Sequence, residues 1–240
     1  GYEQVNSEEY ADVYVINTCT VTNMGDKKSR QIISRARRLN PDAIIAVVGC
    51  YSQIAPKEVS AIEGVDVVLG TRNKGDVVYY VNKARDEQTA QIYVESVLRN
   101  KKFEALNIEE YQDKTRAFLK IQDGCNRFCA YCIIPYSRGS VCSKEPRQVL
   151  DEINKLSEHG FKEIILSGIH TASYGLDLDS EITLVDLLEE IEKLDGIERV
   201  RIGSIEPAFF TPEVIEKIRN MKKLCPQFHL SLQSGCNATL

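Results

Sequence analysis

The sequence has no long apolar run and no excess of positive charge. No stretch approaches the roughly 18 consecutive apolar residues that a membrane-spanning helix requires, and the features of a secretory signal peptide are not visible. The formal net charge is −5 at pH 7, so no global field attracts nucleic acid. Any contact with RNA must therefore come from a local basic patch or from a part of the protein outside this sequence.

Composition and cysteine usage predict a folded protein of the cytoplasm. With 240 residues and 43% apolar residues, the chain can form one large domain or two ordinary ones with a real core. Its eight cysteines mostly stand beside strand-like runs instead of being spaced through loops. This distribution is typical of a reducing compartment, and we expect no membrane association.

The first part of the chain alternates between strand and helix patterns. Compact β-branched runs at 11–16, 43–48 and 65–69 alternate with helical stretches at 26–39, 55–62 and 76–85. Strands that alternate with helices of this length indicate a doubly wound, parallel α/β sheet. We therefore predict a first domain over 1–88, followed by a polar linker over 89–112 in which 92–94 could form a short strand.

The second part predicts an incomplete (β/α) barrel over 113–240. Strand-like runs at 116–121, 162–166, 200–205 and 228–232 alternate with helical stretches at 146–159, 184–194 and 211–223. Each run ends in glycine or polar residues, as expected where a barrel carries its chemistry at the carboxyl ends of its strands. The strands are fewer than a partial barrel of this kind needs, so we expect the chain to be a fragment.

Three cysteines stand together directly after the strand-like run at 116–121. Cys125, Cys129 and Cys132 are separated by three and then two residues, and such gaps allow one loop to wrap an iron–sulfur cluster or a zinc ion. A four-iron cluster on three thiolates keeps one iron open to a small molecule. A structural zinc needs a fourth protein ligand, for which Cys142 is the nearest candidate; a zinc knuckle or buried thiols remain the alternative reading.

Two further cysteines follow neighbouring predicted strands at matched places. Cys19 and Cys50 come just past the carboxyl ends of the first two strands, where open α/β sheets bind their ligands. A buried cysteine can also be a small packing residue, but the matched placement favours ligands. Two thiols are too few for a cluster, so a third is expected upstream. Cys142, Cys225 and Cys236 match no motif, and we predict that Cys225 and Cys236 are packing thiols.

The loop Cys-Asn-Arg-Phe-Cys-Ala-Tyr-Cys resembles the signature of radical S-adenosylmethionine enzymes, with Tyr131 as the aromatic residue before the last cysteine. The resemblance implies that the three cysteines hold a 4Fe–4S cluster whose open iron binds S-adenosylmethionine, which is cleaved to a 5′-deoxyadenosyl radical. It also implies cofactor contacts at Tyr131 and at later strand ends, namely Gly168, Ser204, Glu206 and Gln233. These polar residues could instead cap helices, and His170 departs from the acidic residue that is common after this strand.

The motifs NTCTVTN at 17–23, DKKSRQ at 26–31 and GCYSQ at 49–53 resemble the amino-terminal domain of the methylthiotransferases. That family holds a second 4Fe–4S cluster on three cysteines, of which two match Cys19 and Cys50. The third, in a GCKxN-like motif, has no counterpart here. The motif text is most similar to the branch that modifies N6-threonylcarbamoyladenosine at position 37 of tRNA. The alternatives are the isopentenyladenosine-37 branch and the branch that modifies a ribosomal-protein aspartate.

The resemblance implies an enzyme that adds a methylthio group to carbon 2 of the modified adenosine, with two 4Fe–4S clusters and S-adenosylmethionine. Its expected partners are the tRNA anticodon loop and a reductant such as flavodoxin or ferredoxin. The first strand of the amino-terminal domain, the end of the barrel and the carboxyl-terminal TRAM domain for RNA binding are expected to lie outside this chain, which should be inactive alone. A basic cluster could hold phosphates or be a solvated helix face; it comprises Lys27, Lys28, Arg30, Arg35, Arg37 and Arg38.

Two other classes of protein compete with this interpretation. A radical enzyme with a cobalamin-binding domain would place a histidine loop after an early strand, but no histidine precedes His159. A two-cluster electron carrier would not need a barrel, and it would fail to cleave S-adenosylmethionine under reducing conditions.

Overall fold

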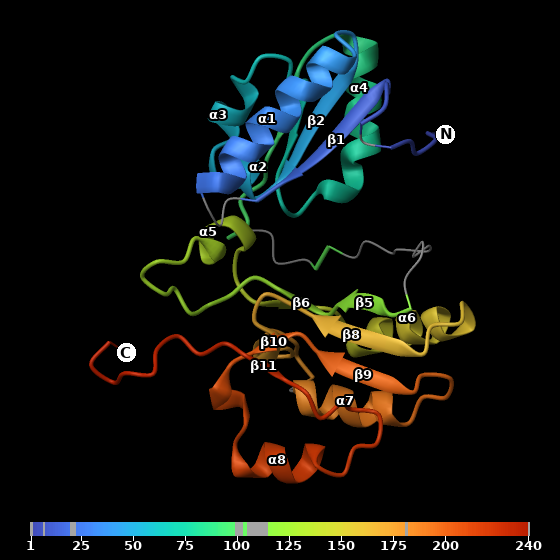
Figure 1. Ribbon diagram of the computed structural model, residues 1–240, viewed down its shortest axis with the longest axis vertical. Coiled ribbons are helices and arrows are strands. Elements are labelled where there is room, and N and C mark those ends of the chain that lie inside the picture. The colour runs from blue at the N-terminus through green and yellow to red at the C-terminus, as the bar shows by residue number, and fades with distance from the viewer. Residues whose placement is uncertain are drawn as a thin grey trace. The chain divides into compact units, whose positions relative to one another are not determined.

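The computed structural model describes residues 2–6, 8–19, 23–98, 103–104, 115–180 and 182–239, with no side-chain description for 23–27. Its contacts divide the chain into two compact units. Unit 1 comprises 1–104 and 127–139, and unit 2 comprises 105–126 and 140–240. Each unit has its own parallel sheet and its own apolar core (Figure 1).

Unit 1 is built on a four-stranded parallel sheet in the order β1-β2-β3-β4. The strands are β1 (Val13–Thr18), β2 (Ile44–Gly49), β3 (Val67–Leu69) and β4 (Gln91–Tyr93). The first three confirm the predicted strands. The fourth corresponds to the possible short strand at 92–94 inside the segment expected to be a linker, and it joins the sheet beside β3. Because β4 is at an edge of the sheet and its Ile92 is exposed, it lacks the continuous apolar pattern of a buried strand.

Helices cover both faces of this sheet. The helices of the amino-terminal part are α1 (Asn23–Leu39), α2 (Cys50–Ile54), α3 (Pro56–Ser60) and α4 (Val77–Glu87), with a 3₁₀ turn, η1 (Lys74–Asp76). Ile45 and Val47 of β2 share a core cluster with Ile33 of α1, whereas the alternate residues of β2 pack with Val81 of α4. The period-2 alternation of β2 thus places one helix layer on each side (Figure 1).

The predicted helix at 55–62 corresponds to α3, which is shorter than expected, and the short helix α2 before it was not predicted. Pro56 has no N–H to donate and occupies the first turn of α3, a position that suits its fixed φ angle. The chain therefore ends α2 at Ile54 and restarts at the proline. Cys50 is the first residue of α2, directly after β2.

Unit 2 contains the parallel strands of the predicted barrel. β5 (Ala117–Lys120), β8 (Glu163–Ser167) and β9 (Arg199–Ile202) form one sheet, and β10 (Ser204–Ile205) pairs in parallel with β11 (His229–Leu230). The predicted strand at 200–205 is divided at Gly203, whose N–H donates to the Leu166 carbonyl at 2.9 Å. An antiparallel pair, β6 (Gln122–Asp123) with β7 (Cys142–Ser143), was not predicted.

The helices of unit 2 pack on one large core. They are α6 (Pro146–Glu158), α7 (Leu184–Glu192) and α8 (Pro212–Ile218), with 3₁₀ turns η2 (Thr171–Ser173) and η3 (Pro207–Phe209). Ile153 of α6, Leu187 of α7 and Leu166 of β8 are all fully buried in this core. α7 begins with a capping box, in which Thr183 and Asp186 each accept a hydrogen bond from the backbone N–H of the other. This βα repeat confirms the mixed α/β class with a partial barrel.

A group of ionic contacts surrounds Glu163 at the amino end of β8. Its carboxylate accepts hydrogen bonds from Arg199 Nε at 2.9 Å and from Arg201 Nε at 2.8 Å, and Arg116 Nη1 lies 3.6 Å away. These bonds hold the pKa of Glu163 below its usual range. These contacts join the amino ends of β5, β8 and β9. In a barrel, residues at the amino ends of the strands contribute to stability, whereas the chemistry takes place at the carboxyl ends.

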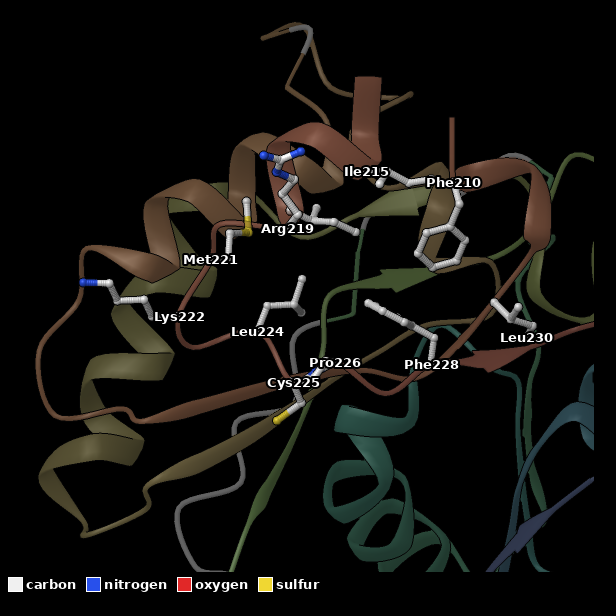
Figure 2. Close-up of a pocket in the computed structure, with 11 residues that line it drawn as sticks. Phe210, Ile215, Arg219, Met221, Lys222, Leu224, Cys225, Pro226, Phe228 and Leu230 are labelled. Carbon is white, nitrogen blue, oxygen red and sulfur yellow. The ribbon is translucent and has the colours of Figure 1, made fainter. Parts of the chain in front are cut away.

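An apolar cavity of about 630 Å³ lies between α8 and the segment that leads into β11 (Figure 2). Phe210, Phe228 and Leu224 contribute apolar surface to it, and Cys225 is also part of its lining.

Cys225 is buried, which confirms its prediction as a packing thiol. Cys236 is exposed, so the same prediction is wrong there; N–H groups of Ala238 and Thr239 donate to its sulfur and lower the pKa of the thiol. Among the described helices, none is long and apolar enough to cross a membrane.

Candidate functional site

The three-cysteine loop leaves β6 through two residues with left-handed backbone conformations. Gly124 has φ 70°, and Phe128, a non-glycine residue, has φ 48°. The loop is tied internally by the Cys132 N–H, which donates to the Cys129 carbonyl at 2.9 Å. Asn126 Oδ1 accepts the Val141 N–H at 3.1 Å. The loop therefore has a defined backbone path, with an unusual conformation between its first and second cysteines.

The chemistry of the donor set fits an iron–sulfur cluster. Cys129 is exposed, and Cys125 and Cys132 are half-buried, so none of the three cysteines is enclosed in a core. All eight cysteines lie among the described residues, and none forms a disulfide. Within the described part of the chain, no three His, Cys, Asp or Glu side chains are gathered as a metal-binding group. Cys142, the candidate fourth zinc ligand, is buried in β7 opposite Asp123.

The segment after Cys132 is held by residues of the amino-terminal part of unit 1. α5 (Ile134–Arg138) follows the last cysteine directly. Thr71 Oγ1 donates to the Ser137 carbonyl at 2.7 Å, and Arg72 Nη2 donates to the Arg138 carbonyl at 2.6 Å. α5 also packs against α2, the helix that begins with Cys50. These bonds satisfy carbonyls at the end of a short helix and fix the position of the chain just after the cysteine loop.

Cys19 and Cys50 lie where the strand pattern placed them. β1 and β2 pair in parallel with Thr18 opposite Gly49, so each cysteine is the next residue after a paired position. Cys19 is exposed and Cys50 is buried at the start of α2. Their role as ligands stays a prediction. Thr20–Thr22 of the NTCTVTN motif lie outside the described residues.

Gly49 determines how the chain turns from β2 into Cys50. Its φ of 102° and ψ of −156° belong to a region that is essentially restricted to glycine. A Cβ atom there would lie 2.6 Å from Asn17 Oδ1 and 2.6 Å from the Thr18 carbonyl oxygen. Both backbone conformation and space therefore require glycine immediately before Cys50.

Replacing Gly49 with alanine should lower the free energy of unfolding by about 3 kcal/mol, through backbone strain and the clash with β1. Gly160→Ala is the matched control, because Gly160 has φ 88° but a Cβ atom added there would meet nothing within 4 Å. It should cost only the strain, about 1 kcal/mol. Chemical denaturation of both variants measures the difference, and equal losses would contradict the steric argument.

The basic segment of α1 divides into paired and unpaired side chains. Arg37 is structural: it donates to the carbonyls of Ala43 and Gly64 and to Asp66. Arg35 pairs with Glu8 at 2.9 Å, and Arg30 Nη2 donates to the Tyr51 hydroxyl at 2.6 Å. Lys28 and Arg38 are exposed, and the side chain of Lys27 lies outside the described residues. Much of the predicted basic cluster thus has a partner within the protein.

The predicted cofactor-contact residues of unit 2 cluster at strand ends. Gly168 follows β8, Ser204 begins β10, Glu206 follows it, and Gln233 lies past β11. His170 Nε2 lies 3.1 Å from Glu206 Oε2, so the SGIH motif and the glutamate meet. Tyr131 of the cysteine loop belongs to unit 1 and is 77% exposed. None of these contacts tests the cofactor roles, which remain predictions.

Sequence reasoning missed two polar residues near these strand ends. His229 Nδ1 lies 2.7 Å from Ser204 Oγ, and Gln122 accepts the His170 N–H at 2.8 Å. The histidine count offered a weak signal for His229, since only three histidines occur in the chain. Nothing in the sequence marked Gln122, because its partners lie on another strand.

Comparison with known proteins defines the class. The profile of the radical SAM superfamily matches residues 119–240, and that of the uncharacterized protein family UPF0004 matches residues 1–70. The chain belongs to the radical SAM superfamily. The radical S-adenosylmethionine methyltransferase TsrM from Kitasatospora setae shares the fold, with a TM-score of 0.57 and 17% identity over 88% of this chain and 47% of its own. A second TsrM structure, with cobalamin and a [4Fe-4S] cluster bound, has a TM-score of 0.56.

Among curated proteins, the chain is 46% identical to the threonylcarbamoyladenosine tRNA methylthiotransferase MtaB of Bacillus subtilis, over 100% of this chain and 53% of that protein. It is 40% identical to MtaB of Aquifex aeolicus, covering 58% of it. A tRNA-2-methylthio-N(6)-dimethylallyladenosine synthase of Clostridium botulinum is 37% identical, with 54% covered. The chain thus spans about half the length of these relatives.

Proposed function

We propose that this chain is part of a tRNA methylthiotransferase that adds a methylthio group to carbon 2 of N6-threonylcarbamoyladenosine at position 37. The observation that carries the proposal is the 46% identity to MtaB over the whole chain. The three-cysteine loop supports it, since three free cysteines outside the core suit a 4Fe–4S cluster. The 37% identity to a dimethylallyladenosine synthase makes the isopentenyladenosine branch the second candidate.

In this proposal, Cys125, Cys129 and Cys132 hold the cluster that binds S-adenosylmethionine. When bound, the cluster and this cofactor supply a 5′-deoxyadenosyl radical, an oxidant stronger than any side chain. The protein's task is to orient the cofactor and to exclude water. Tyr131 would lie against the cofactor, while Gly168, Ser204, Glu206 and Gln233 would contact it from the strand ends.

The SGIH motif ends in His170, where an acidic residue is common. Glu206, at the end of another strand, places an acidic group near this position. Its carboxylate lies beside His170, at 3.1 Å from Nε2. A carboxylate at this place suits the amino group of a methionine moiety, because an ammonium donates charge-assisted hydrogen bonds. We therefore place the amino-group contact on Glu206.

Cys19 and Cys50 would hold a second 4Fe–4S cluster that carries the sulfur to be transferred. Their adjacent positions after paired strands support this assignment. The third ligand would come from the part of the relatives' length that this chain does not span. Within the chain, we propose domains at 1–88 and 113–240 with a linker at 89–112, which includes β4 and half of which lies outside the described residues.

The proposed partners follow from the reaction. The tRNA anticodon loop is the substrate, with Lys28 and Arg38 of α1 available for phosphate contacts and a TRAM domain supplying further RNA contacts. A low-potential reductant such as flavodoxin or ferredoxin would supply electrons. The protein would act in the cytoplasm, and the 240-residue chain alone would be inactive.

Mass spectrometry of tRNA nucleosides from a strain lacking this protein tests the proposal. We expect the 2-methylthio form of N6-threonylcarbamoyladenosine to disappear and to return when the full-length protein is expressed. The 2-methylthio form of isopentenyladenosine should be unchanged. Loss of that second nucleoside instead would favour the isopentenyladenosine branch, and unchanged tRNA with an unmodified ribosomal-protein aspartate would contradict tRNA as the substrate.

A further inference from the structure

Gln122 is a fully buried polar residue at the base of the three-cysteine loop. Its side-chain Nε2 donates to the carbonyls of Asp123 and Gly124, both at 2.7 Å. Its Oε1 accepts the backbone N–H of His170 at 2.8 Å. Both amide hydrogens and one lone pair of the side chain are therefore used, and all partners are backbone groups.

These three bonds join two segments that are far apart in the sequence. Asp123 and Gly124 form the turn that leads into Cys125, and Asp123 Oδ1 accepts the Gly124 N–H at 2.9 Å. His170 follows β8, and its ring lies beside Glu206. One side chain thus connects the start of the cysteine loop to the strand end 48 residues later.

Gly168 fixes the position of Gln122 from the side of β8. A Cβ atom at Gly168 would lie 2.8 Å from Gln122 Oε1 and 3.0 Å from Gln122 Cβ. The absence of a side chain at 168 is what allows the amide to reach His170. Gly168 therefore has a packing role that is separate from any contact with a cofactor.

The three hydrogen bonds of Gln122 make the position of the turn before Cys125 depend on the position of the end of β8. Buried hydrogen bonds in a low dielectric are costly to leave unmade, so a single placement of the amide satisfies all three backbone groups. If the loop turn moves, the His170 N–H loses its acceptor unless the end of β8 moves with it. The first cysteine and the His170–Glu206 contact are consequently set with respect to each other.

We propose that Gln122 is a positioning residue that aligns the cluster-binding loop with the strand end that contacts S-adenosylmethionine. The inference rests on the proposed function and adds to it the residue that couples the turn before Cys125 to the end of β8, both of which lie in unit 2. Gln122 itself touches neither cluster nor cofactor in this account. Its removal should therefore disturb cofactor binding more than iron content.

The test compares Gln122→Met in the full-length protein with a matched control, Asn40→Leu. Both changes replace a buried amide by an apolar side chain of similar size. Asn40 is 3% exposed in unit 1, donates to the Ala11 carbonyl and accepts the Asp42 N–H, both at 3.0 Å. The control therefore reports the cost of losing buried amide bonds away from the cysteine loop.

The measurements are iron content, S-adenosylmethionine affinity and the EPR spectrum of the reduced protein with and without S-adenosylmethionine. Hydrogen exchange of the apoprotein adds a readout without any cofactor. We expect Gln122→Met to weaken S-adenosylmethionine binding by at least about tenfold, as for residues that support metal ligands. The EPR change on cofactor addition should be lost while iron is retained. Exchange should accelerate both around 123–125 and around 168–170, and Asn40→Leu should show none of these effects.

Equal cofactor affinity and EPR response in the two variants would overturn the proposal. If Gln122→Met does not fold, Gln122→Asn, whose amide is one methylene too short, replaces it in the hydrogen-exchange experiment. Faster exchange in both segments supports the link, and faster exchange in only one contradicts it. If the unaltered protein binds neither iron nor S-adenosylmethionine, the proposed function fails, while the apoprotein exchange result still decides whether Gln122 couples the segments.

Discussion

Replacing Cys129 with alanine should abolish reductive cleavage of S-adenosylmethionine by the full-length protein. Removing a group that only supports a metal ligand typically weakens binding by 10–100-fold, so losing a direct ligand should cost more than about 100-fold. The measurement is 5′-deoxyadenosine formed after reduction with dithionite under anaerobic conditions. The fold should survive, because the Cys129 side chain is exposed and makes no core contact.

Cys142→Ala is the matched control for this prediction. Cys142 is buried in β7 and lies opposite Asp123 of β6, the strand that leads into the cysteine loop. It should lower stability through a lost packing group but leave cofactor cleavage near the unaltered level. If Cys142→Ala abolished cleavage and Cys129→Ala did not, the ligand assignment in the loop would be wrong.

Glu163→Gln should cause a large loss of stability for a single polar substitution. The carboxylate is 12% exposed and accepts charge-assisted bonds from two arginines. A neutral amide weakens those bonds and turns one of its N–H groups toward a guanidinium. We expect the free energy of unfolding to fall by about 2 kcal/mol at pH 7, and Tm to fall by about 4–8 °C.

The stability that Glu163 contributes should depend on pH. Hydrogen bonds from Arg201 and Arg199, with the charge of Arg116, hold the pKa of Glu163 below the usual 4.5. Since the folded state favours the ionised carboxylate, the stabilisation is complete above the unfolded pKa and is lost as pH falls through the lower folded value. The difference in stability between the unaltered protein and Glu163→Gln should therefore shrink below about pH 4.5.

Glu190→Gln serves as the control for the pH series. Glu190 pairs with Lys193 at 2.6 Å, but both side chains are about half exposed or more. Such surface pairs contribute less than about 1 kcal/mol. A loss as large as that of Glu163→Gln would indicate that burial and the arginine bonds do not explain the stabilisation at Glu163.

The order of strands and helices could be predicted because each buried strand has a continuous β-branched run and each helix a clear start. Short strands that are stabilised mainly by contacts with other segments were harder to predict. β4 is a short edge strand with an exposed Ile92, so its pattern resembles that of a loop. The pair β6 with β7 has two residues per strand and forms because the cysteine loop returns to the same place.

Cys236 shows why a motif-free cysteine cannot be assigned from its neighbours alone. Its short flanking residues were compatible with packing, but the turn after β11 leaves the thiol exposed to solvent. Whether a small residue is covered depends on what crosses over it, and that is decided by tertiary contacts. Cys225, with the same absence of a motif, is buried beside the α8 cavity.

The candidate site was predictable as far as it depends on spacing along the chain. The gaps between Cys125, Cys129 and Cys132 indicate one loop, and matched strand ends bring Cys19 and Cys50 to adjacent places. The contact of His170 with Glu206 and the bonds of Gln122 join positions that are dozens of residues apart. No local pattern encodes such a pair, because the register between strands determines it.

Whether the protein carries two clusters on these two sets of cysteines can be measured from the iron and acid-labile sulfide content of the anaerobically reconstituted full-length protein, with EPR spectra of the reduced samples. We expect Cys125→Ala and Cys19→Ala each to lose one cluster, about half of the iron, and the double variant to lose both. Only Cys125→Ala should lose the EPR response to S-adenosylmethionine. Zinc in place of iron, or full iron content in Cys125→Ala, would contradict the assignment of the cluster ligands.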